Sequence, residues 1–364
     1  MTSPRHVIVC GAGVIGASIA FFLARRGVSV TVVERSDVAC AASGKSGGFL
    51  ALDWCDGSPL GPLARASFRL HAELARELAA NYGYRRVDTF MMAAREHGTL
   101  AGGHRVSAPR WLDGAAIVTG ELGSVDTTAQ VHPAQLTAAL IAGARAHGAT
   151  LRIGVVEELL QNSGAARGVR IDGAIVEAEA VVLAMGPWTG HVAGPLLPRI
   201  GGLKGYSVTL DCAGVPPHAL FVEYRTGDGR HLEPEIFPRP DGQVYVCGMA
   251  DPAPLPASPE EVTVSAVACA VLARAASRVS TALAAAPIIR RQACYRPVTD
   301  DGLPLIGRIP GVAGGYVATG HGPWGILNAP ATGQAMAELI VDGAASLLDL
   351  SPFDPARLRA ARVR

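Results

Sequence analysis

The stretch HVIVCGAGVIGASIAFFLARRGVSVTVVE, residues 6–34, decides the fold of this 364-residue chain. Its first five residues form a short apolar run rich in β-branched side chains, which predicts a buried strand. Apolar residues then recur with helical periodicity from Val14 to Leu23, and Gly27 is typical of a helix end. Residues 28–33 predict a second buried strand, which Glu34 closes. A strand, a helix and a strand in this order favour the α/β class.

The glycines between the first strand and the helix predict a dinucleotide site. Gly11 permits a tight turn, Gly13 lets the backbone reach a pyrophosphate, and Gly16 lets helix and strand pack closely. The helix N-terminus supplies N–H donors and a positive dipole to the pyrophosphate. Glu34, 18 positions after Gly16, could hold both ribose hydroxyls and would repel a 2′-phosphate, which disfavours NADP. The motif alone leaves NAD, FAD and an ordinary glycine-rich turn open.

Composition excludes several classes of protein. The 32 basic residues balance 31 acidic ones, which argues against binding to nucleic acid. The seven cysteines are odd in number and none forms a CxxC pair, so we expect free thiols, a cytoplasmic location and no metal site. Residues 7–24 are apolar enough to resemble a signal peptide or a membrane span. The glycine turn within them and the strand after them favour a buried unit, so we expect no membrane association.

The rest of the chain predicts further α/β elements and then a different kind of sheet. Residues 133–147, 260–273 and 326–341 have helical periodicity, and residues 63–80 are similar. Short strands separated by turn residues indicate an antiparallel sheet between positions 207 and 247.

A second glycine-rich loop, AASGKSGG at residues 41–48, follows the second strand. Its small residues would let the backbone pass close to a planar ring or to phosphates. The loop also contains a GxSxG pattern, but no strand leads directly into it and no helix clearly leaves it. It resembles the end of a P-loop as well, yet the required first glycine would fall at Ala39. We interpret both matches as chance.

Two C-terminal stretches reveal a family resemblance. RPVTDDGLPLIG (296–307) and GHGPWGILNAPAT (320–332) resemble the flavin-contacting end of the D-amino-acid oxidase, glycine oxidase and sarcosine oxidase superfamily. The N-terminal fingerprint, VHP at 131–133 and VVLAMG at 181–186 match other landmarks of that superfamily, so the similarity runs nearly end to end. SGKSGGFLALDW (43–54) and GHGPWGILNAP (320–330) resemble a poorly characterised branch of FAD-dependent oxidoreductases, which says little about the substrate.

The resemblance implies a Rossmann-type FAD-binding domain and an α+β substrate domain built on an antiparallel sheet. We expect the FAD-binding domain to combine residues 1–50, 130–200 and 290–364, and the substrate domain to combine 51–129 and 201–289. Residues far apart in sequence should meet around one FAD, with a helix N-terminus near the flavin. The predicted cofactor contacts are Gly11, Gly13, Val14, Ile15, Gly16, Glu34, Arg35, Ser43, Gly44, Lys45, Ser46, Gly47, Gly48, Val156, Ala184, Gly186, Trp188, Gly307, Gly320, Gly322, Pro323, Trp324, Gly325 and Ile326.

Arg296 corresponds to the arginine that holds the substrate carboxylate in amino-acid-oxidising members. A guanidinium binds a carboxylate with two parallel hydrogen bonds, although an ion pair with Asp300 or Asp301 is the structural alternative. Lys204 and His321 could modulate flavin or oxygen reactivity through positive charge, and the alternative for each is a solvated or hydrogen-bonded polar residue without such a role. The predicted catalytic residues are Arg296, Lys204, His321 and Trp324, and the predicted substrate-binding residues are Phe49, Trp54, Tyr206, Tyr224, His231, Tyr245 and Arg296.

Two departures from the superfamily affect the predicted site. Glycine-oxidising members carry a second arginine where this chain has Gly322, Pro323 and Trp324. The flavin-linking cysteine of sarcosine-type members should fall near Ala293, whereas Cys294 comes one residue later. Because adjacent side chains of a strand point to opposite faces, we expect FAD to be bound without a covalent link.

The leading hypothesis is oxidation of a C–N bond in a small amine or amino acid. Hydride would pass to flavin N5, an imine would leave, and oxygen would reoxidise the flavin with release of hydrogen peroxide. One alternative is a dehydrogenase that uses another electron acceptor or a non-amine substrate, and another is a flavin-containing interaction protein without turnover. An NAD-dependent dehydrogenase fits the fingerprint but does not account for the C-terminal resemblance. The sequence leaves substrate identity and oligomeric state open.

Overall fold

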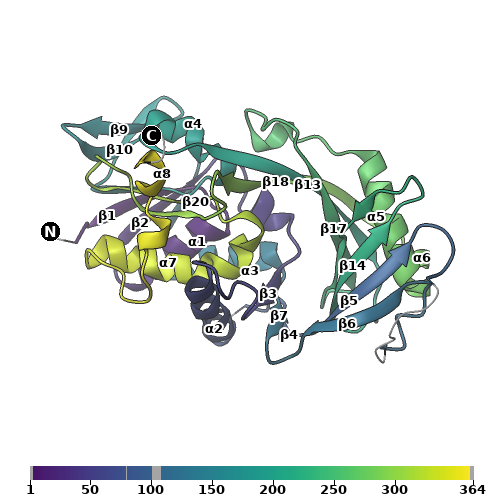
Figure 1. The fold of residues 1–364 in the computed structure, drawn as a ribbon. Coiled ribbons are helices and arrows are strands. Elements are labelled where there is room, and N and C mark those ends of the chain that lie inside the picture. Colours follow the sequence, from purple (N-terminus) through teal and green to yellow (C-terminus); the bar gives the residue numbers. More distant parts are fainter. Residues whose placement is uncertain (1–2, 79, 101–107, 361–364) are drawn as a thin grey trace.

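The N-terminal stretch forms one half of a six-stranded sheet in the computed structural model, which describes residues 3–78, 80–100 and 108–360 (Figure 1). The predicted strand, helix and strand are β1 (His6–Cys10), α1 (Val14–Arg25) and β2 (Ser29–Glu34). The sheet order is β19-β20-β12-β1-β2-β8, parallel except for β19 at one edge. The remaining strands are β8 (Thr150–Ile153), β12 (Ala180–Leu183), β19 (Leu305–Arg308) and β20 (Gly315–Thr319).

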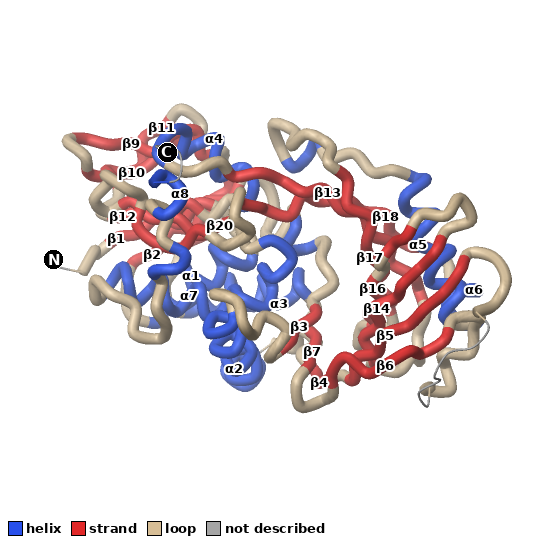
Figure 2. Tube along the Cα trace, viewed as in Figure 1, coloured by secondary structure: helices blue, strands red, loops and turns tan. Residues whose placement is uncertain are grey.

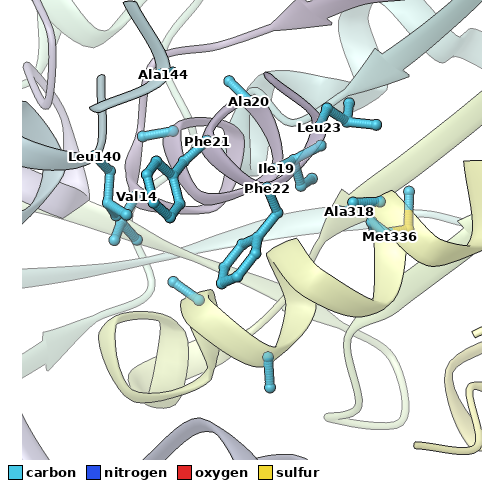
Figure 3. Close-up of a cluster of buried hydrophobic side chains, with 14 of the residues drawn as sticks. Val14, Ile19, Ala20, Phe21, Phe22, Leu23, Leu140, Ala144, Ala318 and Met336 are labelled. Atoms are coloured by element: carbon cyan, nitrogen blue, oxygen red, sulfur yellow. The ribbon is translucent and has the colours of Figure 1, made fainter. Parts of the chain in front are cut away.

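Four helices build the core of this first lobe. They are α1, α2 (Gly61–Glu77), α3 (Pro133–Ala146) and α7 (Gly325–Val341). Figure 3 shows Phe22 of α1 pointing toward α7, while Phe21 lies beside Leu140 of α3. The near-continuous apolar character of α1 thus reflects burial among protein elements, as the sequence predicted. In the part of the chain that the structure describes, no helix is both long and apolar enough to span a bilayer.

A proline inside α7 creates a local requirement that α2 satisfies. Pro330 has no N–H, so the carbonyl of Ile326 lacks its helical donor. His71 of α2 places Nε2 3.0 Å from that carbonyl oxygen and 3.1 Å from the carbonyl oxygen of Leu327. The N–H of Ala331 donates instead to Ser67 Oγ, at 3.0 Å. The two helices are therefore joined by polar bonds at the turn that follows the N-terminus of α7.

The second lobe contains an eight-stranded sheet in the order β18-β13-β17-β16-β14-β5-β6, with β15 paired to β14. Its pairings are antiparallel except for β5 with β14, which confirms the predicted antiparallel architecture. The strands are β5 (Asp88–Arg95), β6 (Ile117–Gly123), β13 (Ile200–Asp211), β14 (His218–Arg225), β15 (His231–Leu232), β16 (Glu235–Pro238), β17 (Gln243–Asp251) and β18 (Ile288–Thr299).

Two helices cover one face of the eight-stranded sheet, α5 (Ala266–Val279) and α6 (Thr281–Ala285). The predicted helix at 260–273 was placed too early, because Ser265 caps α5 by accepting a hydrogen bond from the N–H of Ala268. The opposite face of the sheet points toward the first lobe. Strands β13 and β18 are long enough to run between the lobes (Figure 2).

Smaller elements complete the molecule. One three-stranded sheet, β11-β10-β9, packs on the six-stranded sheet, and another, β3-β7-β4, lies between the lobes. They comprise β3 (Phe49–Ala51), β4 (Arg85–Arg86), β7 (Thr128–Gln130), β9 (Val156–Asn162), β10 (Ala165–Ile171) and β11 (Ala174–Glu177), with the short helices α4 (Thr189–Ala193) and α8 (Arg357–Ala360) elsewhere.

The domain boundaries drawn from the sequence remain a prediction. Helix α2, which falls in the segment assigned to the substrate domain, packs against α7 in the first lobe. Residues 1–2, 79, 101–107 and 361–364 of the proposed segments lie outside the described residues. All seven cysteines are free thiols.

Candidate active site

A cavity of about 490 Å³ runs from the N-terminal glycine turn to the open face of the eight-stranded sheet. Both lobes line it, and so does the start of α7. The cavity therefore brings together the segments near residues 11, 45, 185, 296 and 324, which are distant in sequence.

Glycines form the end of the cavity next to α1, because side chains would not fit there. Gly11 has a φ of +105°, and a Cβ on it would lie 2.6 Å from the carbonyl oxygen of Ala184. A Cβ on Gly16 would lie 1.9 Å from the carbonyl oxygen of Gly11. A Cβ on Gly13 would approach Ser43 Oγ to 3.1 Å, in the space that faces the N-terminus of α1. This cradle of backbone fits a diphosphate.

Glu34 ends β2 at the same part of the cavity. One of its carboxylate oxygens accepts a hydrogen bond from the N–H of Ala12 at 2.8 Å, and the other accepts from the N–H of Ser36 at 3.3 Å. These bonds hold a buried carboxylate at the cavity wall, where it can accept hydrogen bonds from ribose hydroxyls. Arg35 also lines the cavity and forms an ion pair with Glu260 at 3.3 Å.

The second glycine-rich loop is held against both lobes. Ser43 Oγ accepts a hydrogen bond from the N–H of Val14 at 2.9 Å, which ties the loop to the start of α1. The hydroxyl of Tyr245 donates to the carbonyl of Lys45 at 2.6 Å, and Arg239 donates to the carbonyl of Ser46 at 2.8 Å. Strand β3 follows the loop, so Ser46 does not occupy the strand-to-helix turn that a GxSxG nucleophile requires.

Most of the predicted cofactor contacts line this cavity, but four do not. Gly16 packs α1 against the turn, and Gly44 packs against the carbonyl oxygen of Ala39. Gly307 lies beside Pro355, and Gly320 lies beside Thr299 and Pro304. These four glycines permit close packing behind the wall. The predicted residues that line the cavity are Gly11, Gly13, Val14, Ile15, Glu34, Arg35, Ser43, Lys45, Ser46, Gly47, Gly48, Val156, Ala184, Gly186, Trp188, Gly322, Pro323, Trp324, Gly325 and Ile326.

Aromatic side chains surround the end of the cavity next to the eight-stranded sheet. The ring of Phe49 lies 5.0 Å from that of Trp54, 5.1 Å from that of Phe221 and 5.6 Å from that of Phe237, as measured between centroids. Trp324, from the start of α7, lies 6.3 Å from Trp54. All five rings line the cavity, so they form an apolar enclosure of the kind that excludes water from a bound ligand.

Arg296 faces the cavity from β18 without a direct partner. Among the described residues its side chain forms neither a hydrogen bond nor an ion pair, although it is largely buried. The alternative of an ion pair with Asp300 or Asp301 is wrong, because neither carboxylate bonds to Arg296 and Asp301 instead binds Arg357 at 2.8 Å. An unpaired guanidinium in a partly buried cavity favours an anionic ligand group.

Three of the predicted residues lie elsewhere. Lys204 donates from Nζ to Thr263 Oγ1 at 3.2 Å and lies outside the cavity lining. Tyr224 is fully buried in the core beneath α5, and His231 is exposed on the two-residue strand β15. Strand alternation explains Tyr224, because residues 220, 222 and 224 all face the core side of the sheet. Tyr206 and Tyr245 do line the cavity.

His321 lines the cavity and is buried. Its Nε2 lies 3.1 Å from Thr332 Oγ1, and its Nδ1 has no partner among the described residues. Burial lowers the pKa of His321 to about 3, so the imidazole is neutral at physiological pH. The lowered pKa disfavours the charge-based role, which remains a prediction.

The two residues near the superfamily's flavin-linking position have the opposite orientation to the predicted one. Ala293 is buried in the core of the second lobe, whereas Cys294 lines the cavity. Cys294 shares its face of β18 with Arg296, two residues further along the strand. The expected separation of Cys294 from the cavity is thus wrong. The absence of a covalent link to FAD remains a prediction.

Several lining residues were missed by sequence reasoning, notably Glu235, Phe237 and Cys247. They lie on strands that the sequence predicted, β16 and β17. Cys247 shares the parity of Tyr245, so strand alternation from the predicted Tyr245 would have identified it. Glu235 and Phe237 share the parity of the predicted His231, but His231 lies on the separate strand β15, so alternation from it does not carry over to β16.

Comparisons with known proteins agree with this geometry. The family described as FAD dependent oxidoreductase matches residues 6–339. A putative oxidoreductase of Schizosaccharomyces pombe is 32% identical over 98% of this chain and 99% of that protein. The glycine oxidase of Bacillus licheniformis is 31% identical over 94% of each chain. The crystal structure of glycine oxidase from Geobacillus kaustophilus superimposes with a TM-score of 0.78 and 26% identity, covering 98% of this chain and 99% of the other. This chain belongs to the family of FAD-dependent oxidoreductases.

Proposed function

We propose that the protein oxidises the C–N bond of a small amino acid or amine. The observation that carries this proposal is the unpaired guanidinium of Arg296 at the end of the cavity that aromatic rings line. A carboxylate on Arg296 would fix a substrate by two parallel hydrogen bonds, which restricts the position of its α-carbon. Relatives named glycine oxidase support chemistry at carbon–nitrogen bonds.

FAD fits the cradle described above. The backbone around Gly11 and Gly13 would hold the diphosphate, and Glu34 would hold the ribose hydroxyls. The loop at 43–48 and the start of α7 would flank the flavin, with the helix N-terminus favouring negative charge nearby. When bound, FAD supplies the acceptor for a hydride from the substrate carbon. The residues of this chain bind, orient and desolvate the substrate.

We further propose that oxygen is the final electron acceptor, with hydrogen peroxide as a product. The protein would act in the cytoplasm, where its seven free thiols would stay reduced. A dehydrogenase with another acceptor differs only in this second half of the reaction. Peroxide release during aerobic turnover distinguishes the two.

The test is anaerobic mixing of the purified holoenzyme with panels of amino acids, amines, alcohols and heterocycles. Loss of the oxidised flavin's absorbance near its visible maximum reports reduction. We expect amino acids to reduce the flavin. Reduction by alcohols or heterocycles, with no response to any amine or amino acid, would reject the assignment to C–N bonds.

A further inference from the structure

A carboxylate with an unused acceptor faces the aromatic end of the cavity. Glu235 lies on β16 and lines the cavity. Its one hydrogen bond within the described residues comes from the thiol of Cys247, at 3.4 Å between Sγ and Oε2. Oε1 has no protein partner there, so it can accept a hydrogen bond from a ligand.

Glu235 and Arg296 present opposite charges to the same cavity without touching. The two side chains come from β16 and β18, which are separated in the sheet by β17 and β13. They attract each other electrostatically, but no N–O distance within 4.0 Å joins them among the described residues. A ligand that carries both an ammonium and a carboxylate would complement both groups at once.

The other titratable groups around Glu235 are few. Cys247 faces it from β17, Arg296 faces it from β18, and Glu233 precedes it in the chain. Burial raises the pKa of the Glu235 carboxyl, and the positive charge of Arg296 opposes that effect. A carboxylate in such surroundings is a stronger base than one in water, because burial disfavours its charged form.

We propose that Glu235 binds the ammonium group of an amino-acid substrate and removes one of its protons. This inference rests on the proposed function, and it names the preferred substrate class as zwitterionic amino acids whose carboxylate binds Arg296. Amines without a carboxylate would bind Glu235 but leave Arg296 without a partner. Carboxylic acids without an amine would be repelled by Glu235.

The proton transfer prepares the substrate for oxidation. An ammonium nitrogen has no lone pair, so its carbon cannot release a hydride. When one N–H proton moves to a carboxylate oxygen of Glu235, the nitrogen regains a lone pair. With FAD bound as the acceptor, the C–H bond could then break with its electron pair leaving as hydride, while the nitrogen lone pair forms the C=N bond. The iminium product hydrolyses after release, and Glu235 returns its proton to solvent.

The experiment uses the holoenzymes of wild type, Glu235→Gln and Glu233→Gln. Glu233→Gln is a matched control, since it removes the same charge from an exposed residue two positions away that does not line the cavity. The first measurement is the rate of anaerobic flavin reduction by an amino acid, across pH. The second is the Kd of the corresponding deamino carboxylic acid, measured by its perturbation of the flavin spectrum.

We expect Glu235→Gln to slow reduction at pH 7 by about 100-fold or more, as is typical of loss of a general base. Its rate should climb with pH toward the pKa of the free substrate amine, whereas the wild-type rate should level off earlier. The same variant should bind the deamino acid at least threefold more tightly, because the repulsion is gone. If Glu235 had a purely structural role, its substitution would weaken the binding of the amino acid and of the deamino acid together.

Several outcomes would overturn the inference. A Glu235→Gln enzyme with wild-type reduction rates and pH profile would exclude proton removal, and unchanged or weaker binding of the deamino acid would exclude the charge-based selection. If Glu235→Gln does not retain FAD, Glu235→Asp keeps the charge and should preserve the wild-type pH profile at a lower rate. If no amino acid reduces the flavin of the wild-type enzyme, the proposed function itself is rejected. If amino acids reduce the wild-type enzyme and Glu235→Gln equally well, only the role of Glu235 is rejected.

Discussion

The two ends of the cavity are built on opposite principles. At the nucleotide end, backbone and glycines form the wall, and polar groups such as the Glu34 carboxylate already have protein partners. At the substrate end, side chains form the wall, and Arg296 and Glu235 keep hydrogen-bonding capacity that no protein group uses. A fixed cofactor can therefore be recognised by shape, whereas a substrate must satisfy charges that the fold leaves without partners.

Substitution at the nucleotide end should have the largest effect. In Gly16→Ala, the new Cβ would lie 1.9 Å from the carbonyl oxygen of Gly11, so α1 must move away from the turn. We expect loss of FAD, seen as a colourless protein that does not regain the flavin spectrum when FAD is supplied. Gly190→Ala is the control, since a Cβ there meets no atom within 4 Å. A yellow Gly16→Ala protein with normal FAD affinity would contradict the shape-based account.

Substitution at the substrate end should spare the cofactor. Arg296→Met removes the unpaired guanidinium, so we expect kcat/KM for an amino acid to fall about 100-fold or more, or ~3 kcal/mol, while FAD stays bound. The kcat/KM for the corresponding amine without the carboxylate should change little. Arg291→Met, at an exposed arginine on the same strand, is the control and should behave as wild type. Equal losses for the amino acid and the amine would show that Arg296 does not bind the carboxylate.

The two ends also differ in how far sequence alone could predict them. The glycine turn is local, because strand, turn, helix and Glu34 lie within 29 consecutive residues and their spacing carries the chemistry. The substrate end depends on strand order and on which face each side chain takes. Tyr224 and Lys204 were misplaced for this reason, and Glu235 was missed. A one-residue error in strand register exchanges the two faces, so Ala293 and Cys294 were assigned to the wrong sides.

The polar junction between α2 and α7 makes the nucleotide lobe sensitive to acid. Burial lowers the pKa of His71 to about 4 from its ordinary 6.5, so the unfolded chain binds the proton more readily. The free energy of unfolding should therefore have its maximum value, as far as His71 is concerned, above pH 6.5, and should fall as the pH drops toward 4. At pH 5 this one histidine accounts for a loss of ~2 kcal/mol.

A glutamine tests this assignment. The glutamine of His71→Gln can still donate to the carbonyl of Ile326 but does not titrate. Urea unfolding of the holoprotein gives the free energy of unfolding at pH 7 and at pH 5. The loss between these two pH values should be ~2 kcal/mol smaller in His71→Gln than in wild type. His147→Gln, at an exposed histidine, should keep the wild-type pH dependence. An undiminished loss in His71→Gln would place the acid sensitivity elsewhere, for example at His132, whose pKa burial also lowers to about 4.

The smallest effect is expected from the ion pair between Arg35 and Glu260 at the edge of the cavity. Arg35 lines the cavity and forms an ion pair with Glu260. The side chains of Arg35 and Glu260 are 37% and 49% exposed, so this ion pair should stabilise the fold by less than ~1 kcal/mol. We expect Arg35→Gln and Glu260→Gln to raise the Kd of FAD by less than about fivefold, to the same extent, when measured by fluorescence quenching of added FAD. Equal effects mean that only the ion pair was lost. A much larger effect of Arg35→Gln alone would make Arg35 a direct cofactor contact, and the nucleotide end would then depend on an open side-chain charge as the substrate end does.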